Sequence, residues 1–325
     1  MATNPIFLFS LPRSGSTFLQ RLLAGHPEIM TVSEPWLLLP LCYALKSEGT
    51  FSEYNFSWAT RAINEFIMEL PNRQYDYISE LRSFAITLYG KANKKNARFF
   101  LDKTPRYYLI IPEVIEIFPD AKFIFLFRNP LQILGSIIKS LNHNSLCLHE
   151  YHIDLYRGPR LLAEGYRKIR NKSIAVDFEN LISNPIVQLK RITSYLGIDY
   201  TDVMLNAFLN VQFKGTMGDK DGFYSYDKVE ANVTEKWRTV LGTKLRKNYA
   251  KKYVSKLGLD TLQTLGYSQS DLFKNINELK EDRKRLIHDI VDICAANVFR
   301  LTELPLFVKK FRASKIRGSS LVCHR

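Results

Sequence analysis

The chain has 325 residues, enough to bury a large core as one domain or as a domain with an appendage. Its hydrophobic fraction of 46% and charged fraction of 24% are ordinary for a globular protein, whereas its formal net charge of +14 predicts attraction to a polyanion such as a nucleotide, nucleic acid, an acidic glycan or an anionic membrane face. Four scattered cysteines argue against a disulfide framework and a zinc site, and no apolar run approaches the roughly 20 residues that span a bilayer. Because the first expected strand starts near residue 6, we expect no signal peptide and a cytoplasmic location.

Short apolar runs alternate with helical patterns through the first 267 residues. Continuous apolar runs are typical of strands buried on both faces, so the alternation predicts an α/β fold with a parallel sheet between helices. Ligands bind such folds at the carboxyl ends of the strands, where Arg13, Lys103 and Arg128 occur. The expected strands are 6–11, 98–102, 122–127 and 173–178, and the expected helices are 17–25, 76–92, 108–118, 130–141, 154–170 and 185–196.

The turn after the first strand, "LPRSGST" (11–17), has the character of a phosphate-binding loop. Small residues let an anion approach the unpaired backbone N–H groups at the start of a helix. A kinase-type loop would place a lysine before its final Ser or Thr, and no lysine precedes Ser16 or Thr17 here. The magnesium-binding half of that motif is therefore not evident. An ordinary strand–turn–helix connection is the alternative interpretation.

A second stretch, "FIFLFRNPLQILGSIIKS" (123–140), places Arg128 at the end of a buried strand and Ser136 eight residues later. A guanidinium group and a hydroxyl in these positions can both reach one phosphate. The alternative is that the arginine caps another loop and the serine bonds to its own helix.

Together the two stretches resemble the nucleotide-binding motifs of sulfotransferases that use 3′-phosphoadenosine-5′-phosphosulfate (PAPS). "PRSGSTFL" (12–19) is similar to their 5′-phosphosulfate loop, and Arg128 with Ser136 is similar to their 3′-phosphate motif. Two later segments follow in the family's order. Residues 176–198 resemble the segment after the third phosphate-site strand, and 213–220 resemble the lysine-glycine loop that closes over the nucleotide.

The resemblance covers about residues 5–267 and implies a fold, a reaction and a site. The fold is expected to be a P-loop-like parallel sheet flanked by helices. The reaction is expected to move a sulfuryl group from PAPS to an acceptor hydroxyl of a sugar, a lipid or a phenol such as tyrosine, leaving the 3′,5′-bisphosphate PAP and needing no metal. The implied nucleotide-binding residues are Arg13, Ser14, Gly15, Ser16, Thr17, Arg128, Ser136, Lys214 and Gly215.

The opening stretch is most similar to the bacterial and tyrosylprotein branch, whose glutamate matches Glu34. The resemblance implies that Glu34 is the general base. Cytosolic members instead carry a Lys-Thr-His run, where this chain has Lys-Thr-Pro at 103–105. Arg13 and Lys103 fit as the cations that stabilise charge on the leaving phosphate. The residues alone leave open that Glu34 is a charge at a helix N-terminus and that Lys103 pairs with Asp102.

The chain departs from the tyrosylprotein pattern at three positions. Phe178 stands where that pattern has a tyrosine, Ser140 replaces a second arginine in the 3′-phosphate helix, and Phe213 replaces the arginine before the lysine-glycine pair. These changes put the detailed nucleotide contacts in doubt, especially those of the 213–220 loop.

Two other functions compete with the sulfotransferase interpretation. A P-loop kinase of a small molecule would share the fold, but it would need the missing lysine and an acidic magnesium ligand. A non-catalytic protein that binds nucleotides or acidic glycans would not need Glu34 and Lys103, which are both present. No nucleic-acid-binding motif accompanies the basic composition, so nucleic acid is not an expected partner.

Residues 268–325 are expected to form a helical and basic appendage to the domain of residues 1–267. A helix is expected over 272–308, followed by the basic run "KKFRASKIR" (309–317). Such a segment can lie on a membrane surface, here the inner face, through residues 272–317. The alternative is that the helix packs on the core or on a second subunit in a homodimer.

Overall fold

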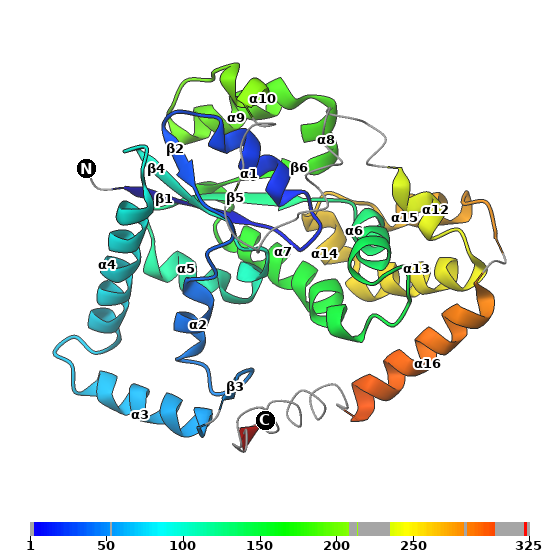
Figure 1. The fold of residues 1–325 in the computed structure, drawn as a ribbon, viewed down its shortest axis with the longest axis horizontal. Helices are drawn as coiled ribbons and strands as arrows, with labels where there is room; N and C mark the ends of the chain where they lie inside the picture. Colours follow the sequence, from blue (N-terminus) through cyan, green and yellow to red (C-terminus); the bar gives the residue numbers. More distant parts are fainter. Residues whose placement is uncertain are drawn as a thin grey trace.

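A five-stranded parallel sheet forms the centre of the molecule in the computed structural model, which describes residues 3–52, 54–207, 213, 235–282, 285–302 and 322–323 (Figure 1). The strand order is β2-β4-β1-β5-β6. The four expected strands are confirmed, and the short strand β2 was not predicted. The strands are β1 (Asn4–Phe9), β2 (Ile29–Thr31), β4 (Phe99–Asp102), β5 (Lys122–Phe127) and β6 (Ser173–Asp177), and a separate antiparallel pair joins β3 (Phe51–Ser52) to β7 (Val322–Cys323).

Alternate residues of each strand point to opposite faces, and the two faces differ in composition. In β1, Phe7 and Phe9 enter one core, whereas Ile6 and Leu8 enter the other. The same alternation holds in β5, so one side of the sheet is rich in phenylalanine and the other is largely aliphatic. Both faces are covered, which explains why the strands read as continuous apolar runs.

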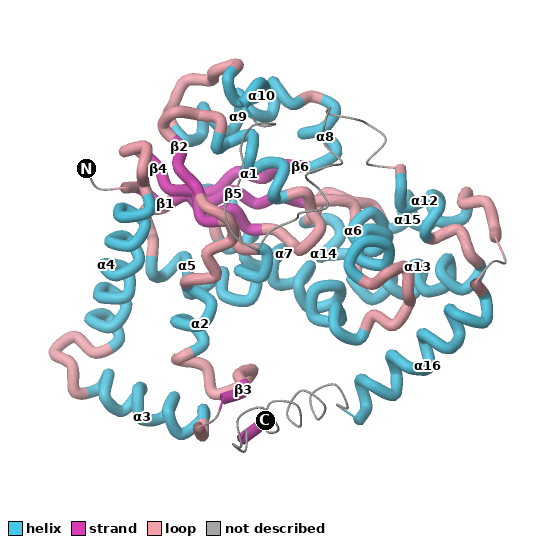
Figure 2. Tube along the Cα trace, in the orientation of Figure 1, coloured by secondary structure: helices cyan, strands magenta, loops and turns pink. Residues whose placement is uncertain are grey.

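Helices cover both faces of the sheet, as expected for this fold class (Figures 1 and 2). The aliphatic face is covered by α1 (Ser16–Ala24), α8 (Phe178–Ser183), α9 (Pro185–Leu196) and α10 (Val203–Ala207). The phenylalanine-rich face is covered by α2 (Leu38–Tyr43), α4 (Gln74–Ala92), η1 (Pro105–Ile110), α5 (Ile111–Ile117), α6 (Pro130–Ser136), α7 (Gly158–Lys168), α12 (Lys236–Val240), α13 (Lys244–Leu257), α14 (Leu259–Thr264) and α15 (Gln269–Asn277). Helix α3 (Phe56–Met68) packs beside α4.

Two expected helices contain a wider, π-helical turn. The helix expected over 130–141 is α6 followed by such a turn, and the one expected over 154–170 begins with a π turn before α7. Pro159 lacks a backbone N–H and its ring would clash with a carbonyl one turn earlier, which accounts for the irregular start of α7. The additional segments are η2 (Ile137–Leu141), η3 (His149–Tyr151), η4 (Ile153–Arg157) and η5 (Arg170–Lys172).

The single helix expected over 272–308 is wrong, because two helices separated by a break occupy its described part: α15 and α16 (Leu286–Thr302). In the break the backbone N–H of Asp282 bonds to the carbonyl of Gly242, and Arg285 has φ 67°. Lys247 of α13 also donates to the carbonyls of Asn277 and Leu279, so tertiary contacts hold the chain where α15 stops. Residues 303–308 and the basic run 309–317 lie outside the described residues.

Helix α15 packs against α13, and its Leu272 and Ile276 belong to the same core as the phenylalanine-rich face of the sheet. The boundary drawn at residue 267 therefore crosses a continuous packed region within the described residues. The division into two domains stays a prediction. No helix in the described part of the chain is long and apolar enough to cross a membrane.

Candidate active site

The loop between β1 and α1 has two residues in the left-handed region, Arg13 with φ 66° and Gly15 with φ 85°. A Cβ atom on Gly15 would lie 2.1 Å from the Phe178 ring, so only glycine fits both the dihedral angle and the space. The Ser14 hydroxyl is buried and has no hydrogen-bond partner among the residues that the structure describes. A buried orphan hydroxyl beside the N-terminus of α1 fits a loop that binds an anion.

The Arg13 side chain turns toward the end of α6. Its Nε donates a hydrogen bond to Ser136 Oγ at 3.0 Å. Arg128, at the end of β5, donates from Nη1 to the Arg13 carbonyl at 2.8 Å and from Nε to Gln132 Oε1 at 2.9 Å. Its guanidinium carbon lies 4.2 Å from the centre of the Phe178 ring. The two expected phosphate stretches are therefore joined by direct contacts.

Lys103 follows β4 and joins the loop to the expected base. Its ammonium lies 2.7 Å from Glu34 Oε1 and donates to Thr17 Oγ1 at 3.3 Å. The side chains of Lys103 and Glu34 are 1% and 9% exposed, so this ion pair is almost fully withdrawn from water. The structure thus brings a carboxylate and a cation together at the start of α1, where an anion is expected to bind.

Trp36 also contacts Glu34, and sequence reasoning missed it. Its indole Nε1 donates to Glu34 Oε2 at 3.2 Å, while its backbone N–H donates to Thr104 Oγ1 at 3.2 Å. Trp36 has φ 53°, which bends the chain so that the indole turns back to a residue only two positions earlier. Both Glu34 oxygens therefore have a donor, and the carboxylate is held in one orientation.

Asp102 is fully buried beside Lys103 and accepts hydrogen bonds from two phenols. Tyr89 donates at 2.6 Å and Tyr107 at 3.1 Å, both to Oδ2. Burial raises the pKa of Asp102 to about 6. These contacts fix the end of β4. They thereby position the next residue, Lys103, which forms its ion pair with Glu34.

A buried glutamine links α1 to the segment that precedes Glu34. Gln20, on α1, donates to Thr31 Oγ1 at 2.8 Å and to the Val32 carbonyl at 2.7 Å. Thr31 in turn donates to the Leu101 carbonyl at 2.7 Å. The sequence offered one signal for these contacts, the amide side chain of Gln20 within the apolar pattern of a helix, because a buried polar side chain needs partners.

The remaining expected residues are placed as follows. Ser16 is the first residue of α1 and is buried. Lys214 and Gly215 lie outside the described residues, so their predicted roles stay predictions. Within the described ranges no group of three or more His, Cys, Asp or Glu side chains is placed to hold a metal ion, and the metal-free reaction also stays a prediction.

The sequence profile described as "Sulfotransferase family" matches residues 5–202, which is more than half of the chain. The chain belongs to the sulfotransferase family. The prediction made from the phosphate loop is thus confirmed at the level of the family. The matched region also includes β2 and Glu34.

Curated relatives agree with this membership. Nodulation protein NoeE of Sinorhizobium fredii is 28% identical over 81% of this chain and 66% of its own length. Protein-tyrosine sulfotransferase A of Caenorhabditis elegans is 25% identical over 63% of this chain and 53% of its own length. This chain thus spans less than two thirds of either relative. Among solved structures, the sulfotransferase domain from the curacin biosynthetic pathway aligns with a TM-score of 0.49 and 19% identity, over 82% of this chain and 99% of that domain.

Proposed function

We propose that this protein transfers a sulfuryl group from PAPS to an acceptor hydroxyl by in-line displacement, with Glu34 as the base. The observation that carries the proposal is the buried contact of Lys103 with both Glu34 and Thr17. It places a carboxylate able to take a proton next to a cation at the phosphate loop. The family membership supports the same reaction over a small-molecule kinase.

The loop and Lys103 are proposed to stabilise the leaving phosphate. PAPS supplies an activated sulfuryl group, and negative charge grows on the phosphate oxygen as that group departs, as in phosphoryl transfer. Fixed donors and cations aimed at this oxygen lower the barrier. Ser14, Gly15 and Thr17 provide donors at the start of α1, and Arg13 and Lys103 provide the cations. Within the described part of the chain, the Ser14 hydroxyl is a donor without a competing partner.

Arg128 and Ser136 are proposed to bind the 3′-phosphate. Both are joined to the phosphate loop through Arg13, one at its carbonyl and one at its guanidinium. A guanidinium group matches phosphate geometry with two parallel donors. Because Arg128 is only 7% exposed, its interaction with a phosphate would be weakly screened by water. This site would favour PAPS over a nucleotide that lacks the 3′-phosphate.

Glu34 is proposed to accept the proton of the acceptor hydroxyl as it attacks. A positioned base contributes roughly 10²–10⁴-fold to such reactions. Trp36 holds one carboxylate oxygen, and Lys103 holds the other. The acceptor is proposed to be a hydroxyl of a sugar, a lipid or a phenol. The similarity to protein-tyrosine sulfotransferases supports the phenol, and tyrosine peptides are the first acceptors to test.

The test is a transfer assay with radiolabelled PAPS in the presence of a metal chelator. Tyrosine peptides, oligosaccharides and glycolipids are supplied in turn, and the label is followed into the acceptor while PAP is quantified. We expect acceptor-dependent PAP release that the chelator does not suppress. Magnesium-dependent formation of ADP from ATP, without PAPS or PAP binding by calorimetry, would overturn the proposal in favour of the kinase.

A further inference from the structure

Tyr267 links the segment after α14 to the end of β6. Its hydroxyl lies 2.9 Å from Glu179 Oε2 and 3.1 Å from Asp177 Oδ2, so two carboxylates share one donor. Burial and the two carboxylates raise the pKa of Tyr267 well above its ordinary value, so the phenol keeps its proton and acts as the donor. Together these three side chains form the Tyr267 latch.

The end of α14 directs Tyr267 toward this position. The backbone N–H of Tyr267 bonds to the Leu262 carbonyl at 2.9 Å, and that of Gly266 bonds to the Gln263 carbonyl at 3.0 Å. Gly266 has φ 88°, so the helix ends in a Schellman motif, whose left-handed residue is usually glycine. The chain therefore leaves α14 by a defined turn that carries Tyr267 back to β6.

The latch flanks Phe178, the residue that stacks on Arg128. Asp177 and Glu179 are the two sequence neighbours of Phe178. The Phe178 side chain is fully buried, and the guanidinium carbon of Arg128 lies 4.2 Å from the centre of its ring. A shift of this short segment would therefore move the surface on which the guanidinium rests.

Glu179 also holds the backbone beside Arg128. Its Oε1 accepts the backbone N–H of Asn129 at 3.1 Å, and the Asn129 side chain in turn caps α6. Burial and the neighbouring carboxylate raise the pKa of Glu179, whereas the bonds from Asn129 and Tyr267 oppose this rise and favour the charged form. One carboxylate thus joins Tyr267 to the residue that follows Arg128.

We propose that Tyr267 is a positioning residue for the 3′-phosphate of the nucleotide. Its hydroxyl holds the carboxylates on either side of Phe178, and through them it holds Arg128 in the orientation that receives the phosphate. Binding groups need such support, because a side chain that is free to move loses part of its affinity for the ligand. The inference rests on the proposed function, since it takes Arg128 as a ligand of the 3′-phosphate. It requires no contact between Tyr267 and the nucleotide.

The first experiment compares PAP with 5′-AMP, which lacks the 3′-phosphate, by calorimetry. Tyr267→Phe removes only the shared donor and should narrow the preference for PAP at least about threefold, a modest coupling within one hydrogen-bonded network. The affinity for 5′-AMP should stay at the parent value. An unchanged preference would overturn the inference. A parent protein that binds both nucleotides equally would overturn the 3′-phosphate assignment of Arg128 and Ser136, and the inference with it.

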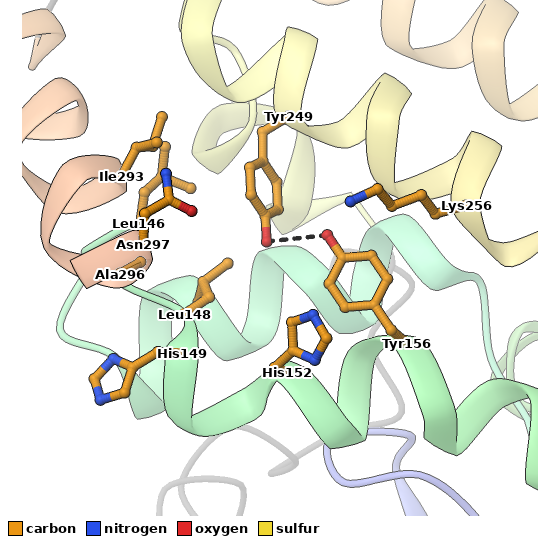
Figure 3. A pocket seen from close by; sticks show the side chains of 10 residues that line it. All are labelled: Leu146, Leu148, His149, His152, Tyr156, Tyr249, Lys256, Ile293, Ala296 and Asn297. Atoms are coloured by element: carbon orange, nitrogen blue, oxygen red, sulfur yellow. Dashed lines mark hydrogen bonds between the residues drawn. The ribbon is translucent and has the colours of Figure 1, made fainter. Parts of the chain in front are cut away.

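Tyr249→Phe is the matched control. The Tyr249 hydroxyl accepts a hydrogen bond from Tyr156 at 3.2 Å, beside a cavity of about 190 Å³ between α13, η4 and α16 (Figure 3). This substitution also removes one hydrogen-bonded phenol hydroxyl, but on elements that contribute no side chain to the latch. Its preference for PAP should equal that of the parent. A loss as large as that in Tyr267→Phe would contradict a specific role of the latch.

The second experiment asks whether Tyr267 acts through Arg128. Arg128→Met keeps much of the side-chain volume and removes the guanidinium. In this background Tyr267→Phe should leave the remaining preference for PAP unchanged, because the group that it positions is already gone. A further loss equal to that in the parent background would show that Tyr267 acts by another route and would overturn the inference.

The third experiment compares two substitutions of Glu179. Glu179→Gln retains an oxygen that can accept the Asn129 N–H, whereas Glu179→Ala removes it. The preference for PAP should therefore be lower in Glu179→Ala than in Glu179→Gln by at least about threefold. Equal preferences in the two variants would contradict positioning through this bond.

Discussion

The Lys103 ammonium lies 2.7 Å from the Glu34 carboxylate, within a site that leaves only 1% and 9% of the two side chains exposed. One cation thus touches both the candidate base and, through Thr17, the phosphate loop. The two halves of the proposed reaction, proton removal and leaving-group stabilisation, meet at a single side chain. Substitutions on either side of this pair should therefore separate the two roles.

Glu34→Gln should lower turnover by roughly 10²–10⁴-fold, because the amide cannot accept the acceptor's proton. PAP affinity, measured by calorimetry, should change little, since the amide oxygen can still accept from Trp36 or Lys103. Glu48→Gln, at an exposed position, is the control and should have full activity. If Glu34→Gln is fully active, the base lies elsewhere, and His143, His149 and His152 are the next candidates.

Lys103→Met should reduce the single-turnover rate by roughly 10²–10³-fold, because a fixed charge near the leaving group would be lost. It should also weaken PAP binding, which distinguishes it from the Glu34 substitution. Lys46→Met provides a control, since Lys46 forms an ion pair with Glu113 that is about one third exposed. A Lys103→Met enzyme with normal PAP affinity and rate would remove Lys103 from the leaving-group role.

Ser136→Ala should narrow the preference for PAP over 5′-AMP by about tenfold, the worth of one hydrogen bond to a charged group. The preference is read as the ratio of the two dissociation constants. Ser140→Ala lies about one turn further along the chain and should leave the ratio unchanged. An unaltered ratio in Ser136→Ala would mean that this hydroxyl serves only to hold Arg13.

Asp102 should make stability depend on pH in a specific direction. Its pKa in the folded protein is raised from 3.8 to about 6, so the folded state binds this proton more tightly than the unfolded state does. The resulting contribution is complete below about pH 4 and is lost as the pH rises through about 6, by an amount on the order of 3 kcal/mol. Denaturant unfolding from pH 4 to pH 7 should therefore show a smaller loss of stability in Asp102→Asn than in the parent.

The control for that measurement is Asp120→Asn, because Asp120 is exposed. Its unfolding free energy should follow the parent at every pH. Parallel curves for the parent and Asp102→Asn would show that Asp102 keeps an ordinary affinity for its proton.

The sequence predicted the central strands well because their burial on both faces leaves uninterrupted apolar runs. Strand β2 escaped prediction because three residues are too short to show a pattern. The break between α15 and α16 was also missed, since it depends on Asp282 meeting Gly242, a partner forty residues away. Such tertiary contacts, which also include the bonds of Lys247 to the Asn277 and Leu279 carbonyls, cannot be read from local periodicity.

In the candidate site, too, the sequence predicted some residues and missed those whose contacts depend on the tertiary structure. Arg13, Lys103 and Arg128 were predicted because strand ends in a parallel sheet gather at one edge. The contacts of Trp36 and Gln20 were not, because they depend on a left-handed turn and on a side chain crossing between elements. The pairing of Lys103 with Glu34, 69 positions earlier in the chain, likewise needed three dimensions.

Because the backbone of Arg13 is left-handed, a substitution there can change the backbone strain of the loop and the charge of the side chain independently. Any residue with a Cβ atom is strained at φ 66°, whereas glycine is not. Replacement by glycine would therefore keep the path of the loop, and even relax it, while removing the guanidinium. Replacement by lysine would keep both the strain and a positive charge. If Arg13 binds the anion as proposed, the glycine variant should lose nucleotide affinity without losing folding stability in proportion, and the lysine variant should keep part of that affinity.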